Sequence, residues 1–499
     1  MPASPETPSQ PGRLRVGRIL GPVLALVLYA LLPSTVPESA RRTAGVGVLM
    51  AVYWMTEAIP VPATALLPLV LFPLLGVLEI DQAAAPFAKP VIFLFLGGFM
   101  LARAVERCGL HRRIALLILR AVGGTPGRLL AGFMAATALL SMWLSNTATA
   151  LMMTPIALSL GALIPRDDTD AESSSGAERF QLCLLLSIAY SCSIGGQGTI
   201  VGTPTNALLI GFLSDRGIEI GFGRWMLVAV PIVVVFFAIV WLIVYRFFLG
   251  PAGRAVGIDH SVIDEQYRGL GAMTRGERTV LAVFLGTAAL WLFSEPLANW
   301  RWLVDACPWV AHLNDATIAM TAAVLLFLLP ADTKTGERTL DWKSVGAEPW
   351  GILILFGGGL SLSTAMVDSS LNQVLADAMV SLQSLPPLLL TMAVTALIIF
   401  LTEFATNAAT LAAMLPVLYG LGENANGGQL QLMIPGALAA SCAFMLPAAT
   451  PPNAVVYGTG RVPMPVMVRC GFWLNLIGIL LIPVAMYVFG DALPDGATP

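Results

Sequence analysis

Apolar runs of about 20 residues recur along the whole chain, from Leu20 to Val488, with short charged connections between them. Charged residues make up 11% of the 499 residues, and hydrophobic residues make up 57%. A water-soluble chain of this length needs far more charge to cover its surface. An apolar run of about 20 residues, in contrast, crosses the roughly 30 Å hydrocarbon core of a bilayer as one helix. The sequence therefore predicts an all-α polytopic membrane protein.

Eleven of the apolar runs are long enough for full crossings. These are expected near residues 17–35, 43–60, 62–78, 91–107, 181–213, 224–248, 278–297, 316–331, 350–366, 431–459 and 466–490. Residues 1–16 begin with a Pro- and Ser-rich stretch, so we expect a disordered cytoplasmic N-terminus. Three arginines between residues 13 and 18 leave a cleaved signal peptide as the alternative, but a second apolar run follows, which favours a first spanning helix.

Lys and Arg residues are distributed unevenly among the connections. Residues 103–128, 246–278 and 334–343 are rich in them, whereas residues 366–385 contain none. Because cytoplasmic loops carry the excess of Lys and Arg, we expect these three connections and the N-terminus on the cytoplasmic side of the inner (plasma) membrane. An odd number of crossings then places the C-terminus outside.

Two more apolar runs have a polar centre and arms too short to cross. Residues 129–144 give about 24 Å of helix, less than the roughly 30 Å core, and Ser-Asn-Thr follows directly. The same pattern recurs from Leu388 through TEFATNAAT to Tyr419. Such backbone persists in a membrane only where it is buried in protein or lines a wet cavity. We therefore expect re-entrant hairpins at 129–165, from the cytoplasmic side, and at 386–422, from the outer side.

Three short sequence motifs occur twice along the chain, in the same order. FLFLGGFML (93–101) resembles LILFGGGLS (353–361), SNTAT (145–149) resembles TNAAT (406–410), and GTPTN (202–206) resembles ATPPN (449–453). Two hairpins that enter from opposite sides make this an inverted repeat, which is typical of secondary transporters. The first repeat is expected to contain residues 17–128, the first hairpin and residues 181–249. A cytoplasmic linker follows at 250–277. The second repeat is expected to contain residues 278–385, the second hairpin and residues 431–490.

Each hairpin tip has the chemistry of an anion site. Ser145, Asn146 and Thr147 occupy the cap and first turn of the second hairpin arm, where free N–H groups, the positive end of the helix dipole and side-chain donors converge. Thr406 and Asn407 offer the same groups from the opposite side. Each tip could thus hold one end of a divalent anion without a buried Lys or Arg.

The proline motifs that follow each hairpin predict helix breaks. A proline inside the membrane removes an N–H group and interrupts the helix. The carbonyl groups released near Gly202 and Ala449, together with the side-chain oxygens of Asn146 and Asn407, form a neutral oxygen cage of the kind that binds sodium. A proton-bearing water is the alternative occupant.

Other interpretations of these residues are less specific. Ser, Thr and Asn in membrane helices often only bond a neighbouring helix, but a matched pair with a downstream break favours a site. The glycine runs at 97–98 and 357–359 indicate close helix packing. Glu57 and Glu403 are acids inside apolar runs, where a functional role is the default hypothesis, although both lie near expected helix ends.

Several functional classes are excluded by composition. The six cysteines and three histidines show no metal-ligand or disulfide spacing, and no long basic run suits nucleic acid. An intramembrane enzyme acting on lipid would need clusters of acid, base or metal-binding groups, which the apolar runs lack. We therefore expect no enzyme and no cofactor other than sodium as a coupling ion.

The motifs TEAIPVPATALLPL (56–69), SNTAT, GTPTN, TEFATNAAT and FMLPAATPPNAVVYG (444–458) resemble those of the divalent anion/sodium symporter family, which comprises dicarboxylate, citrate and sulfate carriers. The resemblance spans about residues 43–490. It implies a homodimer in the lipid bilayer, in which each protomer has a scaffold part and a transport part that moves as an elevator.

The resemblance also assigns residues to the sites. Substrate would bind Ser145, Asn146 and Thr147 at one tip and Thr406 and Asn407 at the other, beside breaks shaped by Thr203, Pro204, Thr450, Pro451 and Pro452. One sodium would bind Ser141, Ser145, Asn146 and the Gly202 carbonyl, and another Thr402, Ala405, Asn407 and the Ala449 carbonyl. The sequence departs from the family at Ala408, where Thr is usual, and at Thr406, where Ser is usual. The change at Ala408 removes one donor from the outer tip.

The expected function is import of a divalent anion coupled to sodium, with a C4-dicarboxylate such as succinate, fumarate or malate as the favoured substrate. A sodium-independent exchanger of dicarboxylates or 2-oxoacids is one alternative. A sulfate or tricarboxylate carrier of the same fold is the other.

Overall fold

The computed structural model describes residues 11–162, 171–256, 261–332, 336–346, 348–378, 385–423 and 428–489. These residues are helical, with connecting turns and one isolated bridge between Pro330 and Arg338. Most of the predicted N-terminal segment, the end of the first predicted hairpin and short parts of the linker and of the second repeat lie outside the described residues.

Five stretches of the described chain are long and apolar enough to cross a membrane, by length and composition: Ile80–Arg107, Phe222–Arg254, Arg275–Ala298, Trp350–Asp368 and Met464–Val488. Six shorter apolar stretches accompany them: Val61–Leu74, Pro204–Ser214, Asp315–Leu328, Pro387–Thr402, Asn407–Gly422 and Leu430–Ala440. The fold class is therefore that of an all-α polytopic membrane protein, as the composition predicted.

The first half of the chain contains these helices: α1 (Pro11–Leu31), α2 (Glu38–Thr56), α3 (Val61–Thr64), α4 (Leu67–Leu74), α5 (Ile80–Ala84), η1 (Ala85–Ala88), α6 (Pro90–Arg107), α7 (Leu110–Val122), α8 (Pro126–Ser141), α9 (Asn146–Ala162), α10 (Ala171–Gly196), α11 (Pro204–Ser214), α12 (Phe222–Ile243), the π-helix η2 (Val244–Leu249), α13 (Gly250–Arg254) and α14 (Ser261–Gly269).

The second half contains α15 (Arg275–Ala298), α16 (Arg301–Ala306), η3 (Pro308–His312), α17 (Asp315–Leu328), α18 (Trp342–Val345), α19 (Glu348–Asp368), α20 (Leu371–Ala378), α22 (Pro387–Thr402), α23 (Asn407–Glu423), α24 (Leu430–Ala440), α25 (Pro451–Gly458) and α26 (Met464–Phe489).

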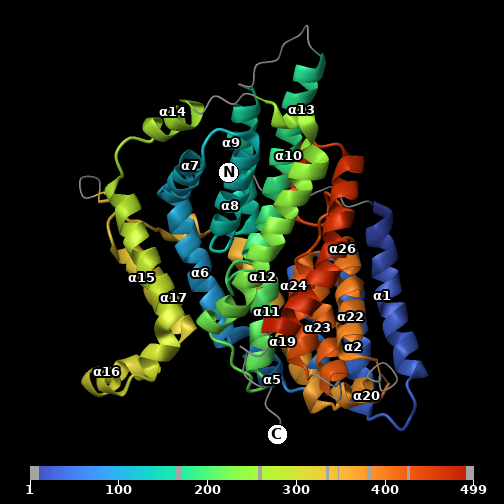
Figure 1. Ribbon diagram of the computed structural model, residues 1–499. Coiled ribbons are helices and arrows are strands. Elements are labelled where there is room, and N and C mark those ends of the chain that lie inside the picture. The colour runs from blue at the N-terminus through green and yellow to red at the C-terminus, as the bar shows by residue number, and fades with distance from the viewer. Residues whose placement is uncertain are drawn as a thin grey trace.

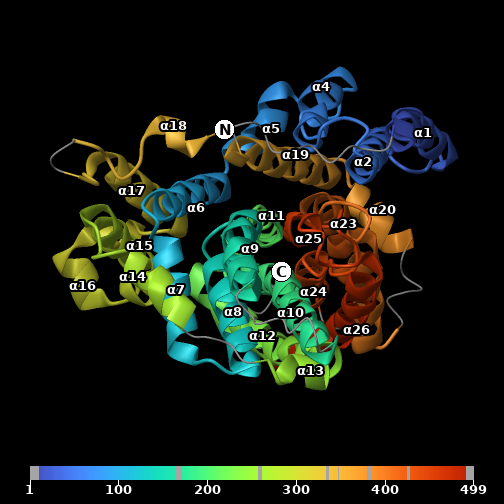
Figure 2. The same ribbon diagram turned by 90° about the horizontal axis from the view of Figure 1, so that it is seen from above.

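The long helices stand side by side in a bundle (Figure 1). Seen from above, α8 to α11 and α23 to α26 cluster together, while α1 to α5 and α19 run along one edge and α15 to α17 along another (Figure 2). Within the cluster α10 packs against α8, α9 and α25, and α24 packs against α22, α23 and α26. The elements that carry the two tips and the two breaks therefore lie in one body.

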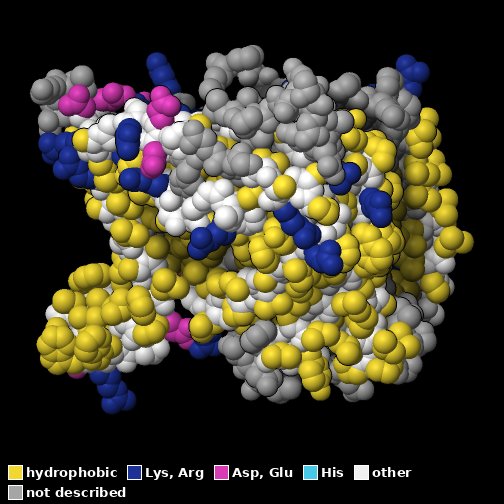
Figure 3. Space-filling view, turned by 45° about the horizontal axis from the view of Figure 1, so that its top comes forward, with side chains coloured by type: hydrophobic (Ala, Val, Ile, Leu, Met, Phe, Trp, Pro, Cys, Tyr) yellow, Lys and Arg dark blue, Asp and Glu magenta, His cyan; other side chains and the backbone are white. Residues whose placement is uncertain are grey.

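The surface of the bundle is largely hydrophobic on its flanks, including a projecting lobe, while the charged side chains gather toward one end (Figure 3). The lobe includes α16, and Trp300, Trp302 and Trp309 are exposed there. A helix surface that is apolar on its outside suits contact with lipid rather than water.

The two glycine runs lie where backbones approach each other. A Cβ atom on Gly97 would lie 2.6 Å from the backbone of Ala319 in α17, and a Cβ on Gly358 would overlap the backbone of Ala65. Any larger side chain would therefore separate α6 from α17 and α19 from the loop after α3. This confirms the close packing that the glycine pattern predicted.

Candidate functional site

The first hairpin tip is a turn between α8 and α9. Helix α8 ends at Ser141 and α9 begins at Asn146. The Ser145 Oγ accepts a hydrogen bond of 3.2 Å from the Ala148 N–H, so this side chain caps α9. The other N–H groups of the first turn, those of Asn146 and Thr147, have no partner within the helix, so they remain available for a ligand at this half-buried tip.

The second hairpin tip repeats this geometry between α22 and α23. Helix α22 ends at Thr402 and α23 begins at Asn407. The Thr410 N–H donates to the Thr406 carbonyl at 2.9 Å, just as the Thr149 N–H donates to the Ser145 carbonyl at 3.0 Å. The Thr406 hydroxyl itself has no hydrogen-bond partner among the described residues, so its donor is free for a ligand.

Behind each tip a hydroxyl, an amide oxygen and a carbonyl lie together. The Ser141 Oγ is 2.6 Å from the Asn146 Oδ1 and 2.8 Å from the Cys192 carbonyl. The single hydroxyl hydrogen can serve only one of these acceptors at a time. A cluster with more oxygens than donors suits a hard cation such as sodium, which prefers oxygen ligands.

The second half contains the equivalent cluster. The Thr402 Oγ1 is 2.8 Å from the Asn407 Oδ1 and 2.9 Å from the Ala440 carbonyl. Thr402 is fully buried, and Ala405 and Ala449 are buried beside this tip and its break. The two candidate cation clusters thus have matching donors and acceptors at distances that differ by at most 0.2 Å.

The first helix break brings its carbonyls to the first cluster. A Cβ atom placed on Gly196 would lie 2.6 Å from the Asn146 Oδ1 and 3.0 Å from the Gly202 carbonyl. Both oxygens therefore face the same small space, which a glycine leaves open. The structure thus brings together Ser141, Asn146 and Gly202, whose association the resemblance implied.

The two breaks have the same backbone course. Thr203 precedes Pro204 at φ −142° and ψ 143°, and Thr450 precedes Pro451 at φ −139° and ψ 146°. This extended conformation is the one that a following proline favours. Both threonines are buried, Pro452 is buried as well, and Pro451 is exposed.

The breaks also meet each other across the two repeats. The Thr205 Oγ1 and the Ser441 Oγ lie 2.7 Å apart, and the Gln197 Nε2 donates to the Cys442 Sγ at 3.4 Å. These contacts join residues more than 230 positions apart in the sequence. The two candidate cation clusters therefore belong to one connected unit.

Glu403, one of the two acids inside apolar runs, anchors the second break. Its carboxylate is 3% exposed and accepts hydrogen bonds from three backbone N–H groups and one amide. The donors are Phe444 N at 2.8 Å, Met445 N at 2.9 Å, Leu446 N at 3.0 Å and Asn475 Nδ2 at 2.8 Å. Sequence reasoning missed this contact because the donors are backbone groups about 40 residues away.

Glu57, the other such acid, is placed differently. It is an exposed residue at the C-terminal end of α2, with a left-handed backbone at φ 51°. Its N–H donates to the Tyr53 carbonyl and so ends the helix. It is therefore an exposed helix-end residue, unlike the buried Glu403.

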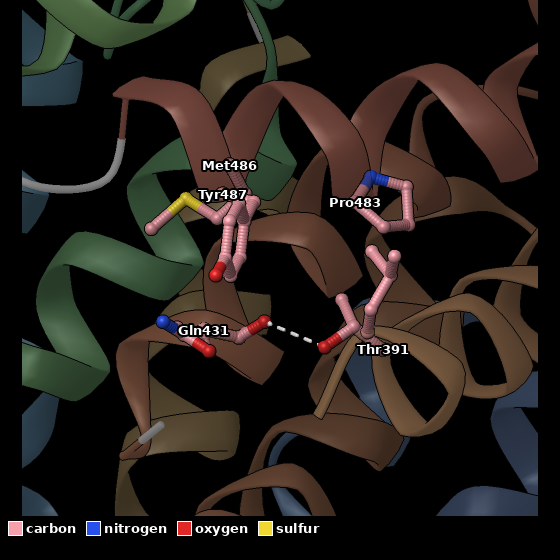
Figure 4. A pocket seen from close by; sticks show the side chains of 6 residues that line it. Thr391, Gln431, Pro483, Met486 and Tyr487 are labelled. Carbon is pink, nitrogen blue, oxygen red and sulfur yellow. Dashed lines mark hydrogen bonds between the residues drawn. The ribbon is translucent and has the colours of Figure 1, made fainter. Parts of the chain in front are cut away.

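A pocket between α22, α24 and α26 contains none of the predicted site residues (Figure 4). Its lining side chains are uncharged, and the Thr391 hydroxyl there donates to the Gln431 carbonyl at 3.4 Å. The lining residues are Leu388, Thr391, Gln431, Pro483, Met486 and Tyr487.

Comparison with known proteins places these features in a family. The model of the sodium:sulfate symporter transmembrane region matches residues 16–494. The sodium-dependent dicarboxylate transporter SdcS of Staphylococcus saprophyticus is 40% identical over 478 residues, covering 95% of this chain and 90% of its own. SdcS of Staphylococcus aureus strain USA300 is 38% identical over 493 residues, covering 96% of this chain and 92% of its own.

A solved structure gives the same fold at lower sequence similarity. The YdaH transporter of Alcanivorax borkumensis aligns with a TM-score of 0.55 and 15% identity, over 97% of this chain and all of that chain. At this identity the likeness concerns the fold alone. The family and the apolar helices together indicate a multi-pass plasma-membrane protein. The match to the family model over nearly the whole chain, with relatives at 38–40% identity, shows that this protein belongs to the sodium:sulfate symporter family of membrane transporters.

Proposed function

We propose that this protein imports a C4-dicarboxylate, such as succinate, fumarate or malate, together with sodium. The observation that supports this most directly is the matched pair of tips, each with a hydroxyl, amide and carbonyl cluster behind it. The names of the relatives, sodium-dependent dicarboxylate transporters, agree with this substrate and this ion.

In this proposal each end of the dicarboxylate binds one tip. One carboxylate accepts hydrogen bonds from the N–H groups at the start of α9 and from the Ser145 and Thr147 hydroxyls. The other carboxylate accepts them from the start of α23, from the Thr406 hydroxyl and from the Asn407 amide. Thr203, Pro204, Thr450, Pro451 and Pro452 border this space.

Sodium supplies the positive charge that the side chains do not. The sequence has no Lys or Arg between Arg128 and Arg166 or between Lys343 and Arg461. A divalent anion at the tips is therefore balanced by two helix dipoles, each about half a charge, and by the bound cations. One sodium would bind Ser141, Ser145, Asn146 and Gly202, and another Thr402, Ala405, Asn407 and Ala449.

The shared asparagines would couple ion to substrate. If Asn146 Oδ1 binds sodium, its Nδ2 is directed away from the ion and toward the tip, where it can donate to a carboxylate. Each ligand then stabilises the orientation that the other needs, and such coupling of affinities is reciprocal. Asn407 does the same at the second tip.

The movement we propose is an elevator motion within a homodimer. The hairpins and the broken helices would move together, because they form one connected unit, against helices such as α6, α17 and α19. The N-terminus would lie in the cytoplasm and the C-terminus outside, in accord with the Lys and Arg distribution.

The test is uptake of labelled succinate into proteoliposomes under three conditions: sodium outside, potassium in its place, and unlabelled succinate preloaded inside. Uptake that requires external sodium is expected. Uptake that ignores sodium but requires internal succinate would replace the symporter with an exchanger. If unlabelled sulfate or citrate inhibits the uptake of labelled succinate more strongly than unlabelled succinate does, that anion is the preferred substrate.

A further inference from the structure

The proline motifs GTPTN (202–206) and ATPPN (449–453) each end in an asparagine that has no role in the proposed function, and its side chain reaches back across the helix break. Asn206 and Asn453 are both fully buried, at the start of α11 and α25. The Asn206 Nδ2 lies 3.0 Å from the Gln197 carbonyl, 2.8 Å from the Thr199 carbonyl and 3.4 Å from the Gly196 carbonyl. One amide group therefore gathers three carbonyls of the first unwound segment.

The second break contains the same arrangement. The Asn453 Nδ2 donates to the Ala443 and Leu446 carbonyls, each at 3.0 Å. Counted back from the asparagine, these are the positions that Gly196 and Thr199 occupy in the first break. Both repeats thus use the third residue of the helix after the break to fix the carbonyls before it.

The orientation of both amides is set by their nitrogen atoms. A flipped amide would place Oδ1 against carbonyl oxygens, which are acceptors only. In the observed orientation the Oδ1 of Asn206 and that of Asn453 are buried and have no hydrogen-bond partner within the described residues. A buried unpaired oxygen costs about 1–3 kcal/mol. Both halves tolerate this cost, which indicates that the amides are held for their contacts with the break.

The gathered carbonyls adjoin the first candidate sodium cluster. The Gly196 carbonyl, a partner of Asn206, and the Met142 carbonyl both face Gly202 so closely that a Cβ atom there would overlap the Gly196 oxygen. Gly202 in turn directs its own carbonyl toward Asn146 Oδ1, since both lie within 3.0 Å of a Cβ placed on Gly196. A shift of residues 196–199 would therefore move a ligand of the ion.

We infer that Asn206 and Asn453 are positioning residues that set the carbonyl geometry, and hence the ion selectivity, of the two sodium sites. Neither side chain needs to touch the ion. This inference rests on the sodium sites of the proposed function. Ligand geometry and number decide which cation a carbonyl cage accepts, so loosening the break should alter the preference between sodium and lithium as well as the affinity.

The test compares Asn206→Asp and Asn453→Asp in the full-length protein in detergent, with thermal stability measured against sodium and against lithium concentration. A ligand that binds only the folded state raises stability in proportion to ln(1 + L/Kd), where L is the ligand concentration, so a fit of this rise gives the half-saturating ion concentration, here called the midpoint, without transport. A carboxyl group offers at most one donor, so the carbonyls lose their common partner. We expect the half-saturating sodium concentration to rise about 10- to 100-fold, the range for residues that orient ion ligands. We also expect the ratio of the half-saturating sodium concentration to the half-saturating lithium concentration to change.

Thr137→Val is the matched control. Thr137 is fully buried in α8, and its hydroxyl donates only to the Phe133 carbonyl of its own helix. This variant should keep the wild-type sodium midpoint and ion ratio. If an Asp variant does not fold, Asn206→Ser, which keeps one donor, should give a smaller shift in the same direction.

The outcomes separate this inference from the proposed function. Folded Asn206 and Asn453 variants with wild-type midpoints and ion ratios would overturn the inference, and so would equal shifts in Thr137→Val. A wild-type protein that sodium does not stabilise would overturn both the inference and sodium coupling. Stabilisation by sodium without sodium-driven uptake would overturn the proposed symport and leave the positioning role supported.

Discussion

In the first half of the chain, a backbone carbonyl of the hairpin tip accepts a hydrogen bond from the helix break, whereas in the second half a side-chain carboxylate of the tip accepts such bonds. The Thr199 hydroxyl donates to the carbonyl of Met142 in the first tip. Glu403 occupies the position equivalent to Met142 in the second tip and accepts three backbone N–H groups from the break. The donor thus lies in the break both times, but only the second attachment depends on a charge.

The halves also differ at the substrate side of their tips. Ser145 is engaged as a helix cap, whereas the Thr406 hydroxyl is unpaired in the described chain, and Ala408 stands where the first tip has Thr147. The cation clusters behind the tips, by contrast, nearly coincide in geometry. In the proposed function, ion binding would therefore use the symmetry of the repeat, while substrate binding would depart from it.

The largest effect is expected from Asn146→Ala and Asn407→Ala. Each removes an amide that, in the proposed function, binds the cation through its oxygen and the substrate through its nitrogen. Because loss of a residue that only orients ligands costs about 10- to 100-fold, loss of a ligand should lower sodium-driven uptake at least about 100-fold. Uptake should be measured with stability against sodium. Thr287→Val, whose hydroxyl bonds only its own helix at Val283, is the control.

If the two clusters are equivalent, both alanine variants should weaken sodium binding to a similar extent. A variant of Asn407 that binds sodium like the wild type, beside an Asn146 variant that does not, would show that only the first cluster holds an ion. The symmetry between the halves would then be structural rather than functional.

Glu403→Gln should show that the second attachment depends on charge. An amide offers one oxygen where the carboxylate offers two, and its NH₂ group would face a backbone N–H. Hydrogen bonds to charged groups contribute about 1.5–3 kcal/mol. Loss of one should therefore lower the sodium affinity, or the equilibrium constant for folding, by about 10- to 100-fold. Met142→Leu, which keeps the backbone carbonyl of the first tip, should behave like the wild type. Equal behaviour of the two variants would contradict the difference drawn between the halves.

Ala408→Thr should restore the symmetry at the substrate side. Ala408 is half-buried at the tip, so a hydroxyl there can reach a bound carboxylate. One added hydrogen bond contributes about 0.5–1.5 kcal/mol, so the KM for succinate should fall about 2- to 10-fold at saturating sodium. Thr147→Ala at the first tip should raise the KM by a similar factor. An unchanged KM in both variants would remove these positions from the substrate site.

The fold class and the glycine packing could be predicted from sequence because they depend on local patterns. Apolar runs of fixed length reveal membrane helices, and glycine pairs reveal close approach. The proximity of Ser141 to Asn146, and of Thr402 to Asn407, also follows from short spacing, since each pair spans one tight turn. The proline motifs indicate the carbonyls released at the breaks, and the family resemblance adds Ser141, Ser145, Thr402 and Ala405 as ion ligands.

The contacts that hold the breaks could not be predicted in this way. Glu403 bonds backbone N–H groups, which every residue except proline has, so no residue type marks its partners. Asn206 and Asn453 are the last residues of the GTPTN and ATPPN motifs, but only the folded break reveals that their side-chain nitrogens donate hydrogen bonds to carbonyl groups. The bond between Thr205 and Ser441 joins two repeats whose relative placement no single repeat specifies.

The smallest effect is expected at an ion pair of the first half whose acidic partner has an uncharged counterpart in the second half. Lys89, which precedes α6, and Asp215, which ends α11, lie 2.7 Å apart, whereas α25 ends at the uncharged Thr459. If α11 moves past α6 during transport, this pair must break in each cycle. Lys89 is 40% exposed, and such pairs contribute about 0.2–1 kcal/mol, so Lys89→Ala should change the maximal uptake rate less than about five-fold and leave the KM unaltered. The exchanged pair Lys89→Asp with Asp215→Lys should return the rate to the wild-type value. A changed KM in Lys89→Ala would instead show that the pair acts on substrate binding rather than on the movement.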